Sequence, residues 1–490
     1  MNADGQHSPL RIIMKTIAIL GGAYAGAPAA ARLAAGLPKR WRIVVIDKNT
    51  HINHVYVMPR YAVLGGHEHK AFCPRINFFQ LLPNPSSLHS SEKQPAYDKE
   101  NHPHLILNAE VLALTPTHVT LNKSFPEHGF PTTEIRYDYL LYALGSKLPA
   151  PLDLWGALPG SIPVSAEPEE SKGLPERYNG TKTEGITWLK THQKVIEDAQ
   201  RILVVGGGAL GIQFATDIAH IHPRKSVILL HSREKLLPRF DSEMHSEIRL
   251  ALESLGVDVI LNERLADRDA PPKYNEKGQR VLKTIKGREI VADLVLMCTG
   301  QTPNTSILKA MDPATVNPHS GLAYVLKTMQ LAVQPQYSSI TSGEEIALQN
   351  LSLDSKDHSI DSTLRVATPY PHIFVAGDTA DAFGAIAAGH TAHFQAEVAA
   401  DNILNLIEVR ERHEQLVEKG GNLAYCKGDE ELREYVPTPP AIKVSLGLND
   451  SITQSNGIIG KKSDGVDDLN AAAVWAYWGM KVQSDSEMYL

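Results

Sequence analysis

Residues 15–48 read KTIAILGGAYAGAPAAARLAAGLPKRWRIVVIDK, and the order of their apolar and glycine residues predicts the first folding unit. The apolar run 17–20 predicts a buried strand, which leads at once into a glycine-rich turn. The alanine-rich stretch 27–37 predicts a helix, with a proline in its first turn where a missing N–H costs little. A second strand, 43–46, ends at Asp47. This strand–turn–helix–strand order is typical of a dinucleotide-binding unit.

In such a unit, backbone N–H groups at the start of the helix receive a pyrophosphate. The acid that closes the second strand accepts hydrogen bonds from ribose hydroxyls, and we expect this role for Asp47. The turn departs from the G-x-G-x-x-G pattern at one position. Ala23 replaces the middle glycine, which lets the phosphate approach closely.

A second copy of the unit lies at residues 201–233, RILVVGGGALGIQFATDIAHIHPRKSVILLHSR. Here Gly206, Gly208 and Gly211 complete the glycine pattern, so we expect them to bind a second nucleotide. Each unit is followed by a similar strand, YDYLLYALG at 137–145 and ADLVLMCTG at 292–300. This internal repetition predicts two domains of related architecture.

Composition excludes several classes of protein. The 490 residues carry a formal net charge of -7, which argues against a nucleic-acid partner. Three cysteines, Cys73, Cys298 and Cys426, form no C-x-x-C, so neither a redox dithiol nor a zinc knuckle is expected. No apolar run spans a bilayer, the start of the chain lacks a signal-peptide core, and Asn2 excludes N-myristoylation. We expect a cytoplasmic protein.

Four histidines, at positions 51, 54, 67 and 69, follow the first unit, but their spacing matches no ordinary metal site and we expect none. We expect a loop and a helix over the first nucleotide, with Arg60 as a phosphate or flavin contact. Stretches 83–104 and 332–362 are polar and predict surface insertions, and 149–182 predicts a crossing between domains. Near the end, 371–378 predicts a strand closing on Asp378, and 385–408 predicts a helix.

Together, the two units, the YDYLLYALG and CTG strands and the late IFVAGD resemble the flavoproteins with two dinucleotide-binding domains. Within that family the chain is similar to apoptosis-inducing-factor-like proteins of the ferroptosis suppressor type. The residues that carry this likeness include NHV at 53–55, LHS at 230–232, AGDTAD at 376–381 and VSLGLND at 444–450.

The resemblance covers nearly the whole chain from Lys15 and implies an α/β fold with two Rossmann-like domains and a smaller C-terminal α+β region. It implies FAD in residues 15–150 and 309–408, NAD(P)H in 184–308, and a C-terminal region at 409–490. It carries FAD contacts onto Gly21, Gly22, Gly26, Arg60, Val111 and Asp378. Ala23, which completes the first turn, and Asp47 join this set.

The chain departs from the family pattern in two places. Gln213 stands where the family usually has a glutamate, and the lysine expected near the C-terminus is absent at Ser484-Asp485. These departures weaken the expectation of ubiquinone reduction at a membrane.

The likeness implies hydride transfer from NAD(P)H through the flavin to a small acceptor, and no further catalytic residue is assigned. His231 occupies in the second unit the slot that Asp47 fills in the first. A histidine cannot accept as a carboxylate does, and Arg233 two residues later suits a 2′-phosphate. Glu234 could serve a free ribose instead. We favour NADPH over NADH on this basis.

Three alternatives stay open. If the chain reduces a small acceptor, that acceptor is a quinone, an aromatic metabolite, oxygen or a one-electron dye. Alternatively, the chain is a tailoring oxidoreductase of specialised metabolism, which Gln213 favours. A signalling, cell-death type of flavoprotein with incidental redox activity is the alternative from another class. Trp475, Tyr477 and Trp478 are either core residues or a weak attachment to a membrane periphery. The oligomeric state is not assigned.

Overall fold

A computed structural model of the chain describes residues 14–80, 102–149, 152–156, 178–266, 271–334, 368–419 and 431–490. Most of the expected insertions at 83–104 and 332–362, and Cys426, fall outside the described residues. Expectations about the first 13 residues fall outside them too.

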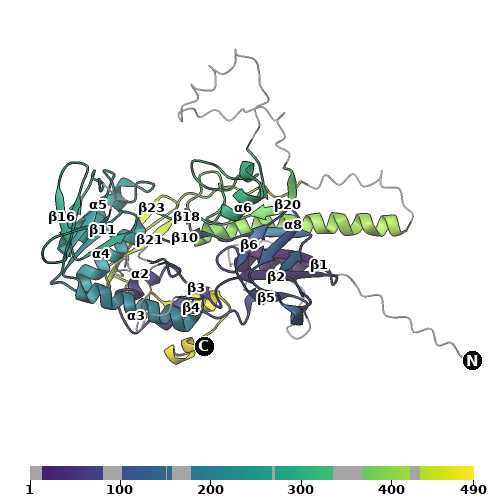
Figure 1. Ribbon diagram of the computed structural model, residues 1–490, viewed down its shortest axis with the longest axis horizontal. Coiled ribbons are helices and arrows are strands. Elements are labelled where there is room, and N and C mark those ends of the chain that lie inside the picture. Colours follow the sequence, from purple (N-terminus) through teal and green to yellow (C-terminus); the bar gives the residue numbers. More distant parts are fainter. Residues whose placement is uncertain are drawn as a thin grey trace, which may run out of the picture.

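The first glycine unit supplies two neighbouring strands, β1 and β2, of a six-stranded sheet (Figure 1). Its strand order is β19-β20-β9-β1-β2-β5, and all neighbours are parallel except β19 and β20. The late strand β20 pairs with β9, so a segment more than 200 residues further along the chain completes the sheet begun by β1. The bounds are β1 Lys15–Leu20, β2 Trp41–Asp47, β5 Leu105–Asn108, β9 Tyr139–Tyr142, β19 Gln330–Leu331 and β20 Tyr370–Val375.

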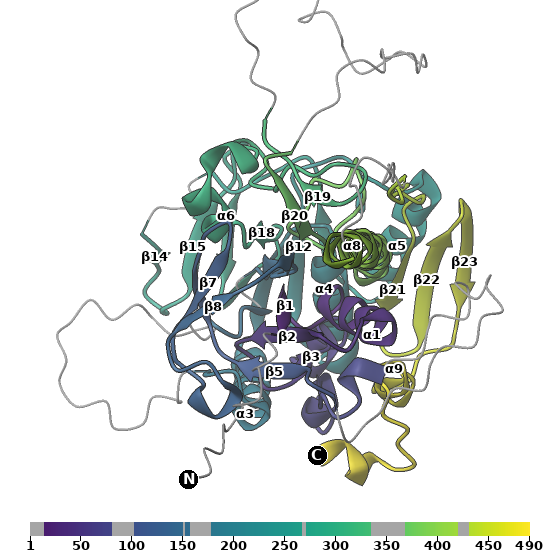
Figure 2. The same ribbon diagram turned by 90° about the vertical axis from the view of Figure 1, so that its right-hand side faces the viewer.

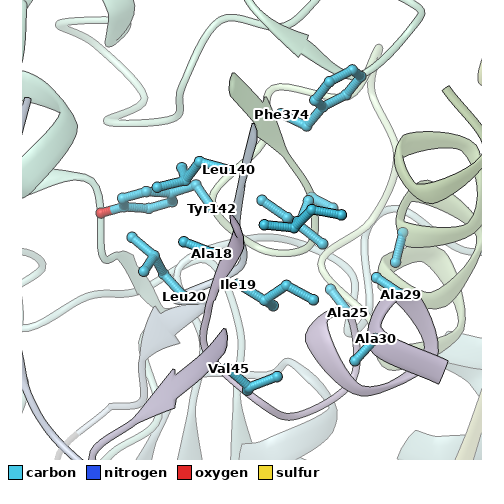
Figure 3. Packing of buried hydrophobic residues seen from close by; sticks show 14 of the residues in the cluster. Ala18, Ile19, Leu20, Ala25, Ala29, Ala30, Val45, Leu140, Tyr142 and Phe374 are labelled. Atoms are coloured by element: carbon cyan, nitrogen blue, oxygen red, sulfur yellow. The ribbon is translucent and has the colours of Figure 1, made fainter. Parts of the chain in front are cut away.

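Helices α1 (Gly26–Gly36) and α8 (Gly389–Glu418) pack against each other beside this sheet, and Figure 2 shows α8 end-on next to α1. Five of the six residues of β1 are buried. Since successive side chains point to opposite sides of the sheet, both faces of this strand are covered. Ile19 points toward Ala29 and Ala30 of α1, whereas Leu20 points to the opposite face (Figure 3). The helix expected at 385–408 corresponds to α8, which begins four residues later and ends ten residues further along the chain.

The second glycine unit builds a four-stranded parallel sheet of order β13-β12-β11-β17. Helix α3 begins with a capping box, in which Thr181 and Glu184 satisfy each other's backbone N–H groups. The bounds are β11 Arg201–Val205, β12 Ser226–Leu230, β13 Asp258–Ile260, β17 Leu294–Met297, α3 Lys182–Asp198, α4 Ala209–Ile221 and α5 Ser242–Ser254.

Short elements join the two sheets. Strands β10 (Ser146–Lys147) and β18 (Thr302–Pro303) pair between them. The other strands and α-helices that precede the C-terminal region are β3 Ile52–Asn53, β4 Phe72–Cys73, β6 Val111–Leu114, β7 His118–Leu121, β8 Glu134–Arg136, β14 Lys273–Tyr274, β15 Arg280–Lys283, β16 Glu289–Ala292, α2 Met58–Tyr61 and α6 Ser306–Met311.

The C-terminal region packs against both halves. Its strands β21 (Ile442–Leu446), β22 (Asp450–Ser455) and β23 (Ile458–Lys462) form a sheet that contacts α4 and α5. Helix α9 (Ala471–Tyr477) instead joins the core of the first sheet, where Trp475 and Trp478 are buried. Tyr477 is the exposed member of this aromatic stretch. No helix in the described ranges is both long and apolar enough to cross a membrane.

Candidate functional site

The first glycine turn leaves no room for side chains at two positions. Gly21 has a φ of +96°, and a Cβ there would lie 2.3 Å from the carbonyl oxygen of Ala143. A Cβ on Gly26 would lie 1.8 Å from the carbonyl oxygen of Gly21. These glycines are therefore required for the turn itself, because it folds back tightly onto β1 and β9.

The middle position of each turn behaves differently. A Cβ built on Gly208 would meet no atom within 4 Å, so this side of the second turn is open. Gly211, by contrast, closes that turn, because its Cβ would lie 1.9 Å from the carbonyl oxygen of Gly206. In the first turn the methyl group of Ala23 occupies the position that corresponds to Gly208. The open middle position is where a phosphate would approach the backbone.

Asp47 lies beside the first turn at the end of β2. Its Oδ2 accepts a hydrogen bond from the Gly22 N–H at 2.7 Å and pairs with Arg75 Nη2 at 2.9 Å. Its Oδ1 accepts from the Asn49 N–H at 2.8 Å. Arg75 is a residue that sequence reasoning missed, because no motif marks it. The pairing of β3 with β4 brings it next to Asp47.

Asp378 approaches the same turn from the end of β20. Gly377, with a φ of +82°, lies so near the turn that its Cβ would be 3.5 Å from the Cβ of Ala25. Ser146 Oγ donates to Asp378 Oδ2 at 2.9 Å. Burial raises the pKa of Asp378, and the hydrogen bond from Ser146 opposes this only in part. The sheet thus brings Asp47 and Asp378 to one turn, although they are far apart in the sequence.

Arg60 and Val111, two other residues expected to contact FAD, lie in other surroundings than Asp47 and Asp378. Arg60 is buried, and its Nε donates to Asp217 Oδ2 at 2.8 Å while its Nη2 donates to the carbonyl oxygen of Gly447 at 2.7 Å. It therefore joins α2, α4 and the turn after β21, and only Nη1 lacks a partner within the described residues. Val111, at the start of β6, is a buried residue of the core around the first sheet.

In the second unit, His231 is a neutral imidazole with both nitrogens engaged. Its Nδ1 accepts from the Gly207 N–H at 3.0 Å, and its Nε2 lies 3.1 Å from the Lys235 carbonyl oxygen, to which it donates. Burial lowers the pKa of His231, and the charge of Arg233 acts in the same direction. His231 therefore supports the turn and has no free acceptor for a ribose hydroxyl.

A cavity of about 660 Å³ opens beside the second turn. This size is in the usual range for sites that bind small molecules. Predicted residues Gly206, Gly208, His231 and Arg233 all line it. Glu234 is not among the lining residues, so the alternative ribose acceptor lies outside the cavity wall.

Two further lining residues, Glu263 and Arg264, were not predicted. The Glu263 side chain is buried, with Oε1 3.3 Å from Arg288 Nη2, and Oε2 has no partner within the described residues. Glu263 and Arg264 follow β13, the edge strand of the second sheet. No motif in the sequence marks residues at this place.

Six aromatic side chains gather beside the first turn, and we call them the aromatic wall: Tyr24, His54, Tyr56, His393, Tyr477 and Trp478. The Tyr24 ring meets the rings of Tyr56 and Trp478 edge-on, with centroids 5.4 and 5.6 Å away. Tyr24 Oη lies 2.8 Å from Nδ1 of His54, whose pKa burial lowers to about 4. His54 thus serves as a neutral partner of a tyrosine.

The two departures from the family pattern have visible consequences. Gln213 Nε2 donates to Ser445 Oγ at 3.3 Å, so this amide contacts β21. At the expected C-terminal lysine, Asp485 instead forms an ion pair with Lys70 at 2.7 Å. Lys70 also pairs with Asp468 at 2.9 Å. A lysine from an early segment therefore meets the C-terminal segment where the family supplies one from the C-terminal side.

Several buried polar atoms around the first turn have no partner within the described residues: Asn53 Oδ1, Arg75 Nε, His390 Nε2 and Trp478 Nε1. Burying such groups without a hydrogen bond is costly. Such donors and acceptors suit a ligand with many polar atoms at this turn. The residues present therefore fit a flavin dinucleotide at the first turn, and the open second turn with its cavity fits a nicotinamide dinucleotide.

Residues 15–331 match the family described as pyridine nucleotide-disulphide oxidoreductase, and the chain belongs to this family. Fe-regulated protein 8 of Mycosarcoma maydis is 38% identical over 469 residues, which cover 95% of each chain. Ferroptosis suppressor protein 1 of Taeniopygia guttata is 25% identical, covering 90% of this chain and 88% of the relative. Apoptosis-inducing factor homolog B of Dictyostelium discoideum is 22% identical, covering 90% and 89%.

Solved structures share the fold. The water-forming NADH oxidase of Lactobacillus brevis, bound to NADH, has a TM-score of 0.52 at 18% identity, covering 90% of this chain and 74% of that one. The NAD-dependent persulfide reductase of A. fulgidus also has a TM-score of 0.52, at 16% identity. This chain spans only 63% of that protein.

These comparisons define the class of the protein. It is an FAD-dependent NAD(P)H oxidoreductase, and its α/β fold contains two Rossmann-like regions. The expected resemblance to flavoproteins of the ferroptosis suppressor and apoptosis-inducing factor type is confirmed. FAD held at the first turn would supply the chemistry of hydride transfer from NAD(P)H.

Proposed function

We propose that this chain uses NADPH as its electron donor and reduces a flat, quinone-like or other small organic acceptor. The observation that carries the donor assignment is the neutral His231 in the slot that Asp47 fills in the first unit. A carboxylate in this slot would repel a 2′-phosphate, whereas a neutral imidazole does not. The nearby Arg233 and Arg264 supply cations at the same cavity.

Glu263 supports the opposite preference, because a buried carboxylate oxygen could accept from a free ribose hydroxyl. Arg288 lies within 3.3 Å of its other oxygen and offsets its charge. The three arginines on the cavity lining, Arg233, Arg239 and Arg264, outnumber this one partly neutralised carboxylate, and NADPH is therefore favoured.

The acceptor assignment rests on the aromatic wall. Tyr56 and Tyr477 are 47% and 42% exposed, while Trp478 behind them is buried. Exposed aromatic faces over a rigid buried ring offer stacking contacts to a flat molecule. Because the wall begins at Tyr24 in the first turn, such a molecule would lie beside the proposed FAD site.

For the FAD site we propose the residues expected from the sequence, in two groups. Gly21, Gly22, Ala23 and Gly26 form the turn that receives the pyrophosphate, and Asp47 accepts from the ribose. The second group consists of Asp378, Val111 and the free Nη1 of Arg60. Gly206, Gly208 and Gly211 shape the NADPH turn. We also propose 15–150 and 309–408 as the FAD-binding domain, 184–308 as the NADPH-binding domain and 409–490 as the C-terminal region.

A second candidate is a tailoring oxidoreductase that acts on a specialised metabolite. Two departures from the family pattern favour it. Gln213, which contacts Ser445, replaces a usual glutamate, and the acidic Asp485 stands where a lysine is expected.

The test is anaerobic reduction of the purified flavoprotein by NADPH and by NADH, followed by reoxidation with a quinone, oxygen and ferricyanide. We expect a yellow protein that NADPH bleaches faster than NADH does, and that a quinone reoxidises. Folded protein that cannot take up FAD would overturn the assignment. Bleaching without quinone reoxidation would favour the tailoring alternative.

A further inference from the structure

A line of three polar side chains leads from the protein interior to the exposed end of the aromatic wall. Tyr477 Oη lies 2.8 Å from His393 Nδ1, and His393 Nε2 lies 3.5 Å from Glu397 Oε1. His393 and Glu397 are one helical turn apart on α8 and are buried, whereas Tyr477 ends α9 and is 42% exposed. The line therefore connects a buried carboxylate with a phenol that solvent and small molecules can reach.

This line of side chains lies against the first glycine turn. Tyr477 contacts Trp478 edge-on at 4.8 Å, and Trp478 contacts Tyr24 of the glycine turn. The start of α8 touches the same tyrosine, because a Cβ on Gly389 would lie 2.6 Å from the Tyr24 ring. A molecule that stacks on the exposed side of the wall would thus have the Tyr477 hydroxyl beside it.

The charge states suit proton donation at Tyr477. Burial raises the pKa of Tyr477 to about 12, and the charge of Glu397 adds to this, so the hydroxyl keeps its proton at neutral pH. Burial by itself would raise the pKa of Glu397, but the hydrogen bond and charge of His393 lower it below its ordinary value. Glu397 is therefore a carboxylate on the Nε2 side of His393.

Other charges near Glu397 are already engaged. Arg32 and Arg433 act on Glu397 through space. Both bind Asp401, Arg32 Nη2 at 3.0 Å and Arg433 Nη1 at 2.6 Å. His393 is thus the group in direct contact with the Glu397 carboxylate.

We propose that Tyr477, His393 and Glu397 form a proton relay that protonates the organic acceptor, an inference that rests on the proposed function. Reduction of a quinone to a hydroquinone takes one hydride equivalent and one proton. NAD(P)H supplies the hydride equivalent through the flavin and becomes NAD(P)⁺. Tyr477 gives its hydroxyl proton to the acceptor oxygen and takes the Nδ1 proton of His393. As the Nδ1 proton leaves, His393 takes a proton from water at Nε2, so the ring never becomes an anion and the water is left as hydroxide. Tyr477 is the catalytic residue, and His393 and Glu397 are positioning residues.

The test compares Tyr477→Phe and Glu397→Gln with Tyr274→Phe, a matched loss of an exposed phenol from β14 of the other half. Each flavin-loaded variant is reduced by NADPH and reoxidised by benzoquinone or by ferricyanide, which takes electrons without a proton. Since general acids contribute about 10²–10⁴-fold, we expect Tyr477→Phe to lower the benzoquinone rate relative to the ferricyanide rate by about ten-fold or more. Tyr274→Phe should leave that ratio unchanged.

A second readout does not depend on activity. The ¹⁵N resonances of His393 in the oxidised protein should shift at Nδ1 in Tyr477→Phe and at Nε2 in Glu397→Gln, and neither should move in Tyr274→Phe. If the two rates fall together, or the His393 signals do not respond, the relay is wrong. If the wild-type protein reoxidises with ferricyanide but with no quinone, the proposed function fails, and the relay fails with it.

Discussion

Asp47 and His231 accept the same hydrogen bond in the two halves of the molecule. Asp47 Oδ2 lies 2.7 Å from the Gly22 N–H, and His231 Nδ1 lies 3.0 Å from the Gly207 N–H. Each side chain therefore supports its glycine turn from the end of the neighbouring strand. Only the first of them is a carboxylate, and the proposed NADPH preference of the second turn rests on this difference in charge.

Arg233→Ala should raise the KM for NADPH more than the KM for NADH. The guanidinium lines the cavity, and a hydrogen bond to a charged group contributes about 1.5–3 kcal/mol, so we expect a change of about ten-fold or more for NADPH. Steady-state kinetics with both nucleotides measures it. Glu234→Gln, outside the lining, is the control, and equal changes for both nucleotides would remove the 2′-phosphate assignment.

Gly208→Ala should weaken nucleotide binding without destabilising the protein. Its φ of -84° is allowed for alanine, and no atom lies within 4 Å of the added Cβ, which would stand where the phosphate approaches. Gly211→Ala should lower stability by about 1–3 kcal/mol or more, because its Cβ would clash with the Gly206 carbonyl oxygen. Calorimetric titration with NADPH and thermal unfolding distinguish the two. Tight nucleotide binding by Gly208→Ala would contradict the open-side interpretation.

Asp378→Ala should reduce the amount of FAD that copurifies with the protein. The carboxylate lies beside the first turn and is held by Ser146, so its loss removes an oriented acceptor. The ratio of flavin to protein absorbance measures occupancy. Asp381→Ala, three residues along the same segment, is the matched control. Full occupancy in Asp378→Ala would refute the role.

Stability should fall in acid because of Glu411 on α8. Burial alone would raise the pKa of Glu411, but hydrogen bonds from Arg40, Trp41 and Lys15 outweigh it and lower the pKa from 4.5 to about 2. A lowered folded-state pKa means that the contribution is present above about pH 4.5 and is lost as the pH falls toward 2.

Thermal unfolding of Glu411→Gln and wild type between pH 6 and pH 2 checks this prediction. The Tm of the variant should be lower at pH 6, and the difference should disappear near pH 2. Glu408→Gln, on the exposed side of α8, should show little difference at any pH. A constant gap between Glu411→Gln and wild type would show that the charge is not responsible.

The local part of the site could be predicted from the sequence. Each glycine turn, its helix and the strand that follows lie within about 35 residues, and tight turns accept only a few residue types. For this reason spacing alone places Gly21, Gly26, Gly206 and Gly211 in tight turns, and at each of them a Cβ would clash with a backbone carbonyl oxygen. Asp47 and His231 followed from the same reasoning, since each closes the strand next to its turn.

Contacts between distant segments were decided only by the tertiary structure. Arg60 pairs with Asp217 across 157 positions, and Lys70 meets Asp485 across more than 400. No periodicity or spacing marks such partners, because side-chain charges meet only after the sheets and the C-terminal region have packed.

The sequence by itself determined that the chain has two dinucleotide units, because strand, turn and helix patterns are written in consecutive residues. Only the tertiary structure decided which side chains from distant segments meet beside each turn. Arg75, Glu263 and the line from Tyr477 to Glu397 depend on strands and helices from separate segments meeting at one place. Packing, which depends on shape and burial across the whole chain, sets that meeting.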